Sequence, residues 1–207
     1  MVCRKRGVSS GDYTKHLSCV RKALELLRKA NLKVNVAKSL FATQSIKYLG
    51  YLVTTEGIKP LADKVAAIQR MERPKTLRQL RSFLGMVNYY RDMWKKRSHI
   101  LAPLTALTKG GVSSRKAKNT VLNWTKECDE AFAQIKDAIS EETLLAFLDF
   151  NKTFEIHTNA SDYQLGGVVS QESRPIAFYS RKLNPAQKGY TTGEKEMLSV
   201  VEMLKEY

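Results

Sequence analysis

The apolar residues of this chain change their spacing part-way along, and this change constrains the fold more than any other feature. Through most of residues 17–139 they recur at intervals of three and four residues, which is typical of amphipathic helices. From residue 154 they alternate with polar residues, as in Phe154, Ile156 and Thr158, which is typical of a strand with one buried face. The sequence therefore predicts an α+β fold.

Individual elements follow from the same spacing and from turn and capping residues. Thr76 with Gln79, and Thr191 with Glu194, have the spacing of capping boxes at helix starts. The predicted helices are 17–27 (ending near Asn31), 65–71, about five turns over 80–94, 101–107, an acidic helix over 128–139, and 191–207. The predicted strands lie within 45–53, before a Glu56–Gly57 turn, and near 154–159, 165–170 and 174–180, with an exposed basic linker at 109–118.

Positive charge is concentrated in the first part of the chain. Residues 1–118 contain 26 Lys and Arg against 6 Asp and Glu, a charge of +20, whereas residues 119–207 contain 9 against 14, a charge of −5. The formal net charge is +15 over 207 residues. Such segregation favours a basic half that binds a polyanion, above all nucleic acid, over a merely solubilising surface.

Other features bear on the compartment. Cys3, Cys19 and Cys128 have neither metal-ligand nor disulfide spacing, which fits a reducing environment. No apolar run approaches the roughly 20 residues of a membrane span, and no apolar segment follows the basic residues 4–6 to form a signal peptide. We expect an intracellular chain, cytoplasmic or nuclear, without a membrane partner.

A series of short sequence blocks identifies a family. In chain order they are YLGY (48–51), GIKP (57–60), LGMVNYYR (84–91), APL (102–104), NW (123–124), AF (131–132), HTNAS (157–161), PIAFYSR (175–181), Tyr190 and EKE (194–196). So many blocks in one order over residues 15–207 closely resemble the reverse transcriptase and RNase H region of gypsy-type LTR retrotransposon polyproteins.

The resemblance implies a domain organisation. Residues 1–60 would be the C-terminal remnant of a palm with a primer-grip-like hairpin, and residues 61–118 a thumb-like helical region with a basic linker. Residues 119–150 would form the connection, and residues 151–207 the N-terminal half of an RNase H-like domain. The implied fold is therefore a helical thumb and connection between a palm remnant and a partial RNase H-like mixed sheet.

Two groups of residues are candidates for binding nucleic acid. The resemblance places Leu49 and Gly50 in the primer grip, where a glycine lets the backbone approach a sugar-phosphate chain; an ordinary hairpin glycine is the alternative. Arg81, Gly85 and Tyr89 recur at i, i+4 and i+8 on a helix face that is separate from the apolar one and also holds Arg78.

A cation, a small residue and a flat ring on one helix face suit tracking along a minor groove without reading sequence, as similar helices in reverse transcriptase thumbs do. A mid-helix glycine costs roughly 1 kcal/mol relative to alanine, so it needs a reason, and helix–helix packing is the competing one. The basic clusters 95–97 and 115–118 would add phosphate contacts or form solvated loops.

Most catalytic acids of the family are missing. The polymerase pair should stand about ten residues before His16, where residues 2–6 contain no acid. The resemblance places the first RNase H aspartate at Asn159, a neutral residue, and a second acid at Glu196, with the remaining acids expected beyond Tyr207. Two-metal catalysis needs several carboxylates, so we expect no functional metal site here, although the intact family uses Mg²⁺, and no other cofactor.

The sequence thus predicts a catalytically inactive fragment of a reverse transcriptase and RNase H that still binds RNA/DNA duplexes non-specifically. One alternative is a part of an active enzyme whose other segments supply the acids. Another is a protein-interaction role, for which the sequence names no partner.

Overall fold

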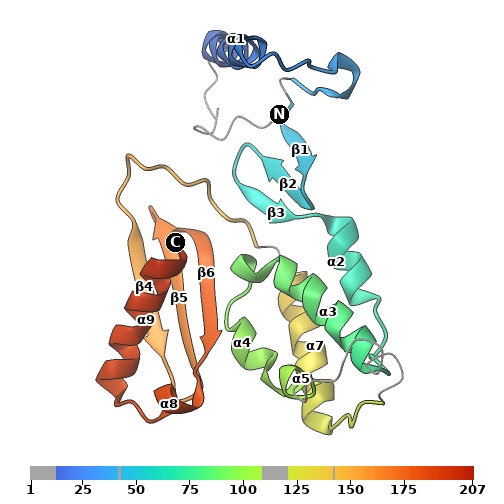
Figure 1. The fold of residues 1–207 in the computed structure, drawn as a ribbon, viewed down its shortest axis with the longest axis vertical. Coiled ribbons are helices and arrows are strands. Elements are labelled where there is room, and N and C mark those ends of the chain that lie inside the picture. The colour runs from blue at the N-terminus through green and yellow to red at the C-terminus, as the bar shows by residue number, and fades with distance from the viewer. Residues whose placement is uncertain (1–12, 42, 109–120, 142) are drawn as a thin grey trace.

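The structure, a computed structural model, describes residues 13–41, 43–108, 121–141 and 143–207. Two small three-stranded sheets flank a group of helices (Figure 1). The longer helices are α1 (Tyr13–Lys29), α2 (Ala62–Gln69), α3 (Leu77–Tyr89), α7 (Lys126–Ser140) and α9 (Thr192–Glu206). The shorter ones are α4 (Arg97–Ile100), α5 (Ala102–Ala106) and α8 (Pro185–Lys188), with 3₁₀ turns η1 (Val36–Lys38) and η2 (Arg91–Met93).

The first sheet is an antiparallel meander of β1 (Ser45–Tyr48), β2 (Tyr51–Thr54) and β3 (Ile58–Pro60). A two-residue turn joins β1 to β2, and both of its residues are left-handed, with φ of 43° at Leu49 and 75° at Gly50. Such turns match the twist of a hairpin, and glycine adopts them without steric cost. The predicted strands and the turn before Gly57 are confirmed.

The second sheet consists of β4 (Glu155–Ala160), β5 (Gln164–Gln171) and β6 (Arg174–Lys182), all antiparallel. Short connections between consecutive strands force this arrangement. The expected mixed sheet is therefore purely antiparallel over the described residues. Helix α9 packs on β4 and β5, and Gly167 permits this close approach, because a Cβ there would lie 2.6 Å from Met203 Sδ.

One apolar core joins the helices to the second sheet. Its members come from α2, η2, α5 and, above all, α3 and α7, and Phe178 of β6 extends it to the sheet. The residues whose exposed fraction is at most 1% include Leu80, Phe83, Val87, Trp94, Leu104, Ile135 and Ile139. The acidic helix predicted over 128–139 is confirmed as α7. The predicted boundary at residues 118/119 remains a prediction.

The helix predicted over residues 80–94 is shorter than expected. Helix α3 ends at Tyr89, and Tyr90 leaves the helical region with φ −101° and ψ 26°. The chain then forms η2 and reverses at Lys96, whose φ is 51°. Tyr90 and Trp94 are still buried, so tertiary packing, rather than a continued helix, accounts for their apolar spacing. The region predicted as one helix over 101–107 begins earlier, with α4 before α5.

The predicted capping boxes and the predicted left-handed residue after the first helix are confirmed. The two capping boxes, at Thr76 with Gln79 and at Thr191 with Glu194, are both present. Helix α1 is followed by left-handed Asn31, with φ of 54°. A third capping box, Asn184 with Gln187, starts α8, a helix that sequence analysis missed.

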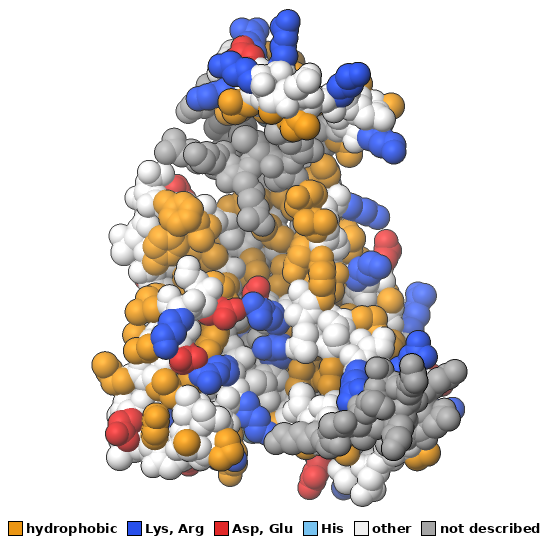
Figure 2. Space-filling view, in the orientation of Figure 1, with side chains coloured by type: hydrophobic (Ala, Val, Ile, Leu, Met, Phe, Trp, Pro, Cys, Tyr) orange, Lys and Arg blue, Asp and Glu red, His pale blue; other side chains and the backbone are white. Residues whose placement is uncertain are grey.

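The N-terminal helix α1 lies apart from the core (Figure 1). Helix α1 stands at the top of the view, well separated from α3 and α7 (Figure 1), and basic side chains predominate over it (Figure 2). The linker predicted at 109–118 and the residues before Tyr13 lie outside the described residues. No helix in the described ranges is long and apolar enough to cross a bilayer.

Candidate nucleic-acid interface

The outward face of α3 carries four of the predicted binding residues. The opposite side of the helix is held in the core by Leu80, Phe83 and Val87. This packing leaves Arg78, Gly85 and Tyr89 exposed and Arg81 half-buried. A Cβ built at Gly85 would have no atom of the described residues within 4 Å beyond its own helix. Helix–helix packing therefore does not explain this glycine within the described chain.

The β1–β2 turn lies directly beside the C-terminal end of this helix face. The Tyr89 hydroxyl donates a hydrogen bond to the carbonyl oxygen of Leu49. A Cβ at Gly50 would lie 3.0 Å from Cε1 of the Tyr89 ring, so the ring packs against the turn backbone. The structure thus joins Leu49 and Gly50 to the α3 face. We call Leu49, Gly50, Arg78, Arg81, Gly85 and Tyr89 the α3 strip.

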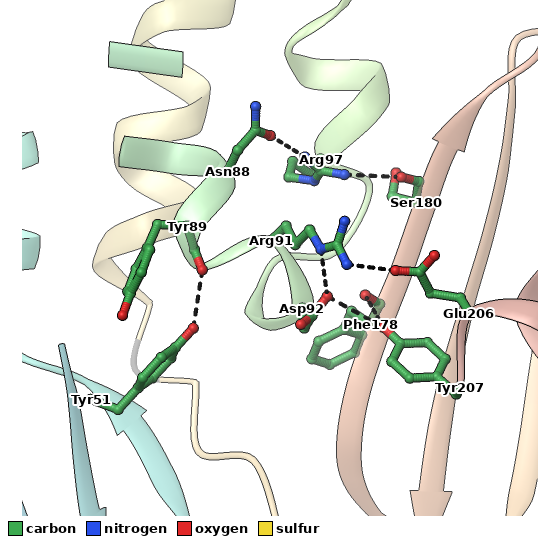
Figure 3. Close-up of polar contacts among 10 residues, drawn as sticks. All are labelled: Tyr51, Asn88, Tyr89, Arg91, Asp92, Arg97, Phe178, Ser180, Glu206 and Tyr207. Atoms are coloured by element: carbon green, nitrogen blue, oxygen red, sulfur yellow. Dashed lines mark hydrogen bonds and ion pairs between the residues drawn. The ribbon is translucent and has the colours of Figure 1, made fainter. Parts of the chain in front are cut away.

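Two further tyrosines, which sequence analysis did not select, complete the junction. The Tyr90 hydroxyl donates to Gly50 O at 2.8 Å. The Tyr51 hydroxyl donates to Tyr89 O at 3.0 Å, as Figure 3 shows. The Tyr51 ring stacks on the Tyr89 ring, with centroids 5.6 Å apart and planes 25° apart. One face of Tyr89 is thus engaged within the protein, yet half of this residue remains exposed.

Burial disfavours the ionisation of the Tyr51 and Tyr90 hydroxyls. It raises the pKa of Tyr51 to about 12, with the neighbouring Tyr89 as the second cause, and it also raises the pKa of Tyr90. A raised pKa in the folded state means that the contribution to stability is complete below the ordinary tyrosine value. It is lost only as pH rises towards 12. At neutral pH both side chains are therefore hydrogen-bond donors.

For Arg97, the expectation that the basic cluster 95–97 contacts phosphates or forms a solvated loop is wrong. Its guanidinium donates to the side chain of Asn88 and, at 3.2 Å, to the carbonyl oxygen of Ser180, so it joins α3 to β6 (Figure 3). Desolvation lowers the pKa of Arg97, and the neighbouring Arg91 adds to this effect. Arg97 is therefore a structural group between the helices and the sheet. The cluster 115–118 lies outside the described residues.

More polar contacts hold the second sheet against the helices. The backbone N–H of Ser98 donates to Ser180 Oγ at 2.9 Å, and Arg91 pairs with Glu206 of α9 at 2.5 Å. These partners are 82 and 115 residues apart in sequence. No sequence pattern marks such pairs, because the polar residues involved suit many other partners equally well.

The RNase H-like candidates lie on facing elements. Asn159 is exposed in β4, and its carbonyl oxygen lies 3.4 Å from Ser199 Oγ of α9. Glu196 is one helical turn before Ser199 and is also exposed. Both candidates therefore flank the contact between β4 and α9. Within the described ranges, no group of three or more His, Cys, Asp and Glu side chains could hold a metal ion.

A buried lysine beside this contact escaped sequence analysis. Lys195 Nζ lies 2.8 Å from Asp162 Oδ1, and only 8% of its side chain is exposed. This hydrogen bond and the charge of Lys195 lower the pKa of Asp162. Asp162 thus remains ionised but is paired with a cation.

Comparisons with known proteins define the class of the chain. Residues 124–207 match the model of the RNase H-like domain found in reverse transcriptase. The chain is 38% identical to the retrovirus-related Pol polyprotein from transposon opus of Drosophila melanogaster over 94% of its length, and 35% identical to that from transposon gypsy of the same organism over 93%. The Tf2-3 polyprotein of Schizosaccharomyces pombe is 32% identical over 97% of the chain.

The fold comparison agrees with this assignment. A foamy viral protease-reverse transcriptase in complex with an RNA/DNA hybrid superimposes with a TM-score of 0.80, at 24% identity, over 96% of this chain and 26% of its own. The same viral protein in complex with double-stranded DNA gives 0.78 over 96% of this chain and 41% of its own. The chain belongs to the gypsy-type retrotransposon Pol polyprotein family and corresponds to the region that spans the C-terminal part of the reverse transcriptase and the RNase H-like domain. It covers 15–20% of the length of these curated relatives.

Proposed function

We propose that this chain binds nucleic-acid duplexes through the α3 strip without reading their sequence, and that it does not cleave them by itself. The observation that carries the binding proposal is that no other part of the described chain covers Gly85, which lies on an exposed helix face. Arg78 and Arg81 lie before Gly85 on this face of α3, and the β1–β2 turn, which contains Gly50, lies beside the C-terminal end of the face. Proteins of similar fold have been solved with an RNA/DNA hybrid and with double-stranded DNA, which supports the proposal.

The chemistry of the α3 strip suits duplex shape rather than base identity. Arg78 and Arg81 supply fixed positive charge for phosphates. The bare backbone at Gly85 and Gly50 lets sugars and phosphates approach closely, and the exposed part of Tyr89 offers an apolar surface for a sugar. The strip has neither Asn nor Gln, the residues that pair bidentately with adenine, and both arginines suit phosphates as well as bases. The charge of +20 over residues 1–118 adds a long-range attraction.

Duplex binding should depend steeply on salt. Two arginine–phosphate contacts predict that affinity falls about tenfold when salt rises from about 50 to about 200 mM, because condensed counterions are released on binding. Fluorescence anisotropy with a labelled RNA/DNA hybrid and with a second hybrid of scrambled sequence measures both salt dependence and sequence preference. We expect equal affinities for the two hybrids. Absence of binding at the lower salt, or affinity independent of salt, would reject the binding proposal.

The proposed lack of cleavage rests on Asn159. An amide cannot offset the charge of a divalent ion as a carboxylate does, and Glu196 alone is too weak a ligand for two ions. We expect no Mg²⁺-dependent cleavage of an RNA/DNA hybrid by the chain. We also expect Asn159→Asp to raise Mg²⁺ affinity several-fold in isothermal titration calorimetry. Asp162→Asn is the matched control, and it should change little, because Lys195 already neutralises Asp162.

Hybrid cleavage by the unaltered chain would contradict the lack of activity. The proposal stands if hybrid cleavage appears only when Asn159→Asp is introduced into a longer chain that supplies further acidic residues. The region would then be part of an enzyme with a defective site.

A further inference from the structure

The two residues of the β1–β2 turn present both of their carbonyl groups to α3. Leu49 O accepts from the Tyr89 hydroxyl, and Gly50 O accepts from the Tyr90 hydroxyl at 2.8 Å and from the backbone N–H of Leu61 at 3.4 Å. Two consecutive tyrosines at the end of one helix thus bind the two consecutive carbonyls of one turn. The Tyr51 hydroxyl in turn binds Tyr89 O, so β2 is also tied to the helix end.

These contacts determine which way the turn faces. In a trans peptide the C=O and the following N–H point in opposite directions. Because the carbonyl of Leu49 points at Tyr89, the N–H of Gly50 points away from the helix. No backbone acceptor for the N–H groups of Leu49 and Gly50 is found among the described residues. Rotation of this peptide would reverse the group that the turn presents.

The turn needs outside support to keep this orientation. A non-glycine residue in the left-handed region is sterically strained, because its Cβ approaches the following carbonyl oxygen. Leu49 has φ of 43°, and this residue is 67% exposed to solvent. The packing of the Leu49 side chain therefore contributes little to holding the turn in place. Tyr90 is 4% exposed, and burial raises the pKa values of Tyr51 and Tyr90, so both hydroxyls remain hydrogen-bond donors. The hydrogen bonds from the tyrosines offset the cost of the strained turn.

We propose that Tyr51 and Tyr90 are positioning residues that hold the Leu49–Gly50 turn rigidly against α3, so that turn and helix meet a nucleic-acid duplex as one preformed surface. The proposal rests on the duplex binding proposed above. Neither residue needs to touch the nucleic acid. Tyr89 belongs to the binding surface itself and is therefore left unaltered in the test.

The test removes single hydroxyl groups and keeps the rings. Tyr90→Phe and Tyr51→Phe each abolish one hydrogen bond, and Tyr190→Phe, at an exposed tyrosine in the loop before α9, is the control. The first readout needs no nucleic acid. In ¹⁵N relaxation, the order parameters of the Leu49 and Gly50 amides should fall from about 0.85 towards about 0.6. Those of α3 should not change.

The second readout is hybrid affinity as a function of salt. We expect each of the two variants to bind about 3–10-fold more weakly with an unchanged salt slope, because preorganisation is lost while phosphate contacts are kept. A variant that had lost its folded structure would instead show low order parameters for the α3 amides. In that case the other variant tests the proposal. Unchanged order parameters in the folded variants would overturn the proposal even if the affinity fell.

Increased motion of the turn with unchanged affinity would also overturn the positioning role. Failure of the unaltered protein to bind any duplex would instead reject the proposed function. The relaxation data would in that case still decide whether the tyrosines hold the turn.

Discussion

Replacing Gly85 with glutamate is expected to weaken duplex binding by about 100-fold, or roughly 2.7 kcal/mol, while leaving the protein folded. The side chain would extend from the middle of the α3 strip into space that the described chain leaves open. It would hold a bound duplex away from the helix and place a negative charge beside phosphates. In the free protein the same change removes a mid-helix glycine, so stability should rise by roughly 0.5 kcal/mol.

Two controls make this result specific. Gly193→Glu introduces the same charge on α9. A Cβ at Gly193 likewise has no atom of the described chain within 4 Å beyond its own helix, so this variant should bind duplexes with almost unchanged affinity. Gly85→Ala tests bulk without charge and should weaken binding less than glutamate does. Affinity is measured by anisotropy and stability by urea unfolding. If Gly85→Glu bound duplexes like the unaltered protein, the α3 strip would not be the binding surface.

Replacing Gly57 with alanine is expected to destabilise the fold by about 3 kcal/mol, which shifts the unfolding equilibrium about 150-fold. A Cβ at this position would lie 2.2 Å from the carbonyl oxygen of Leu145 and 3.1 Å from its carbonyl carbon. Both atoms belong to the backbone, so no side-chain rotation relieves the clash. The neighbouring hydrogen bonds, from Ile58 N to Leu145 O at 2.8 Å and from Leu145 N to Ile58 O at 2.9 Å, would have to open.

Gly85→Ala is the matched control for this prediction, because the same substitution at an open helix position should stabilise by up to about 1 kcal/mol. Urea denaturation followed by circular dichroism compares the two variants. Opposite signs are expected. A Gly57→Ala variant as stable as the unaltered protein would show that the first sheet and the segment after α7 are not held together at this point.

Prediction from sequence succeeded where the physical cause is local. The spacing of Leu80, Phe83 and Val87 defines the buried side of α3, because side chains three and four residues apart lie on one side of a helix. The same periodicity put the predicted residues of this helix on its outward face. The capping boxes at Thr76 and Thr191 likewise depend on contacts within three residues, so they were found.

Prediction failed where the chain folds back on itself. The apolar spacing continues through Tyr90 and Trp94, but the helix stops at Tyr89, and the next residue hydrogen-bonds to a turn 40 residues earlier. Arg97 is part of a basic run in the sequence, yet in the fold it joins α3 to β6. Lys195 resembles a solvated helix residue, yet it is buried and paired with Asp162.

The sequence by itself determined the class of fold, most of the longer helices and strands, the face of α3 that points outward, and the absence of a carboxylate at residue 159. Only the tertiary structure decided that Leu49 and Gly50 adjoin that face, that Tyr51 and Tyr90 hold them there, and that nothing in the described chain packs over Gly85. The physical reason is the range of the interactions. Periodicity and capping act within one or two turns of backbone, whereas a hydroxyl can bind any carbonyl that folding brings within about 3 Å.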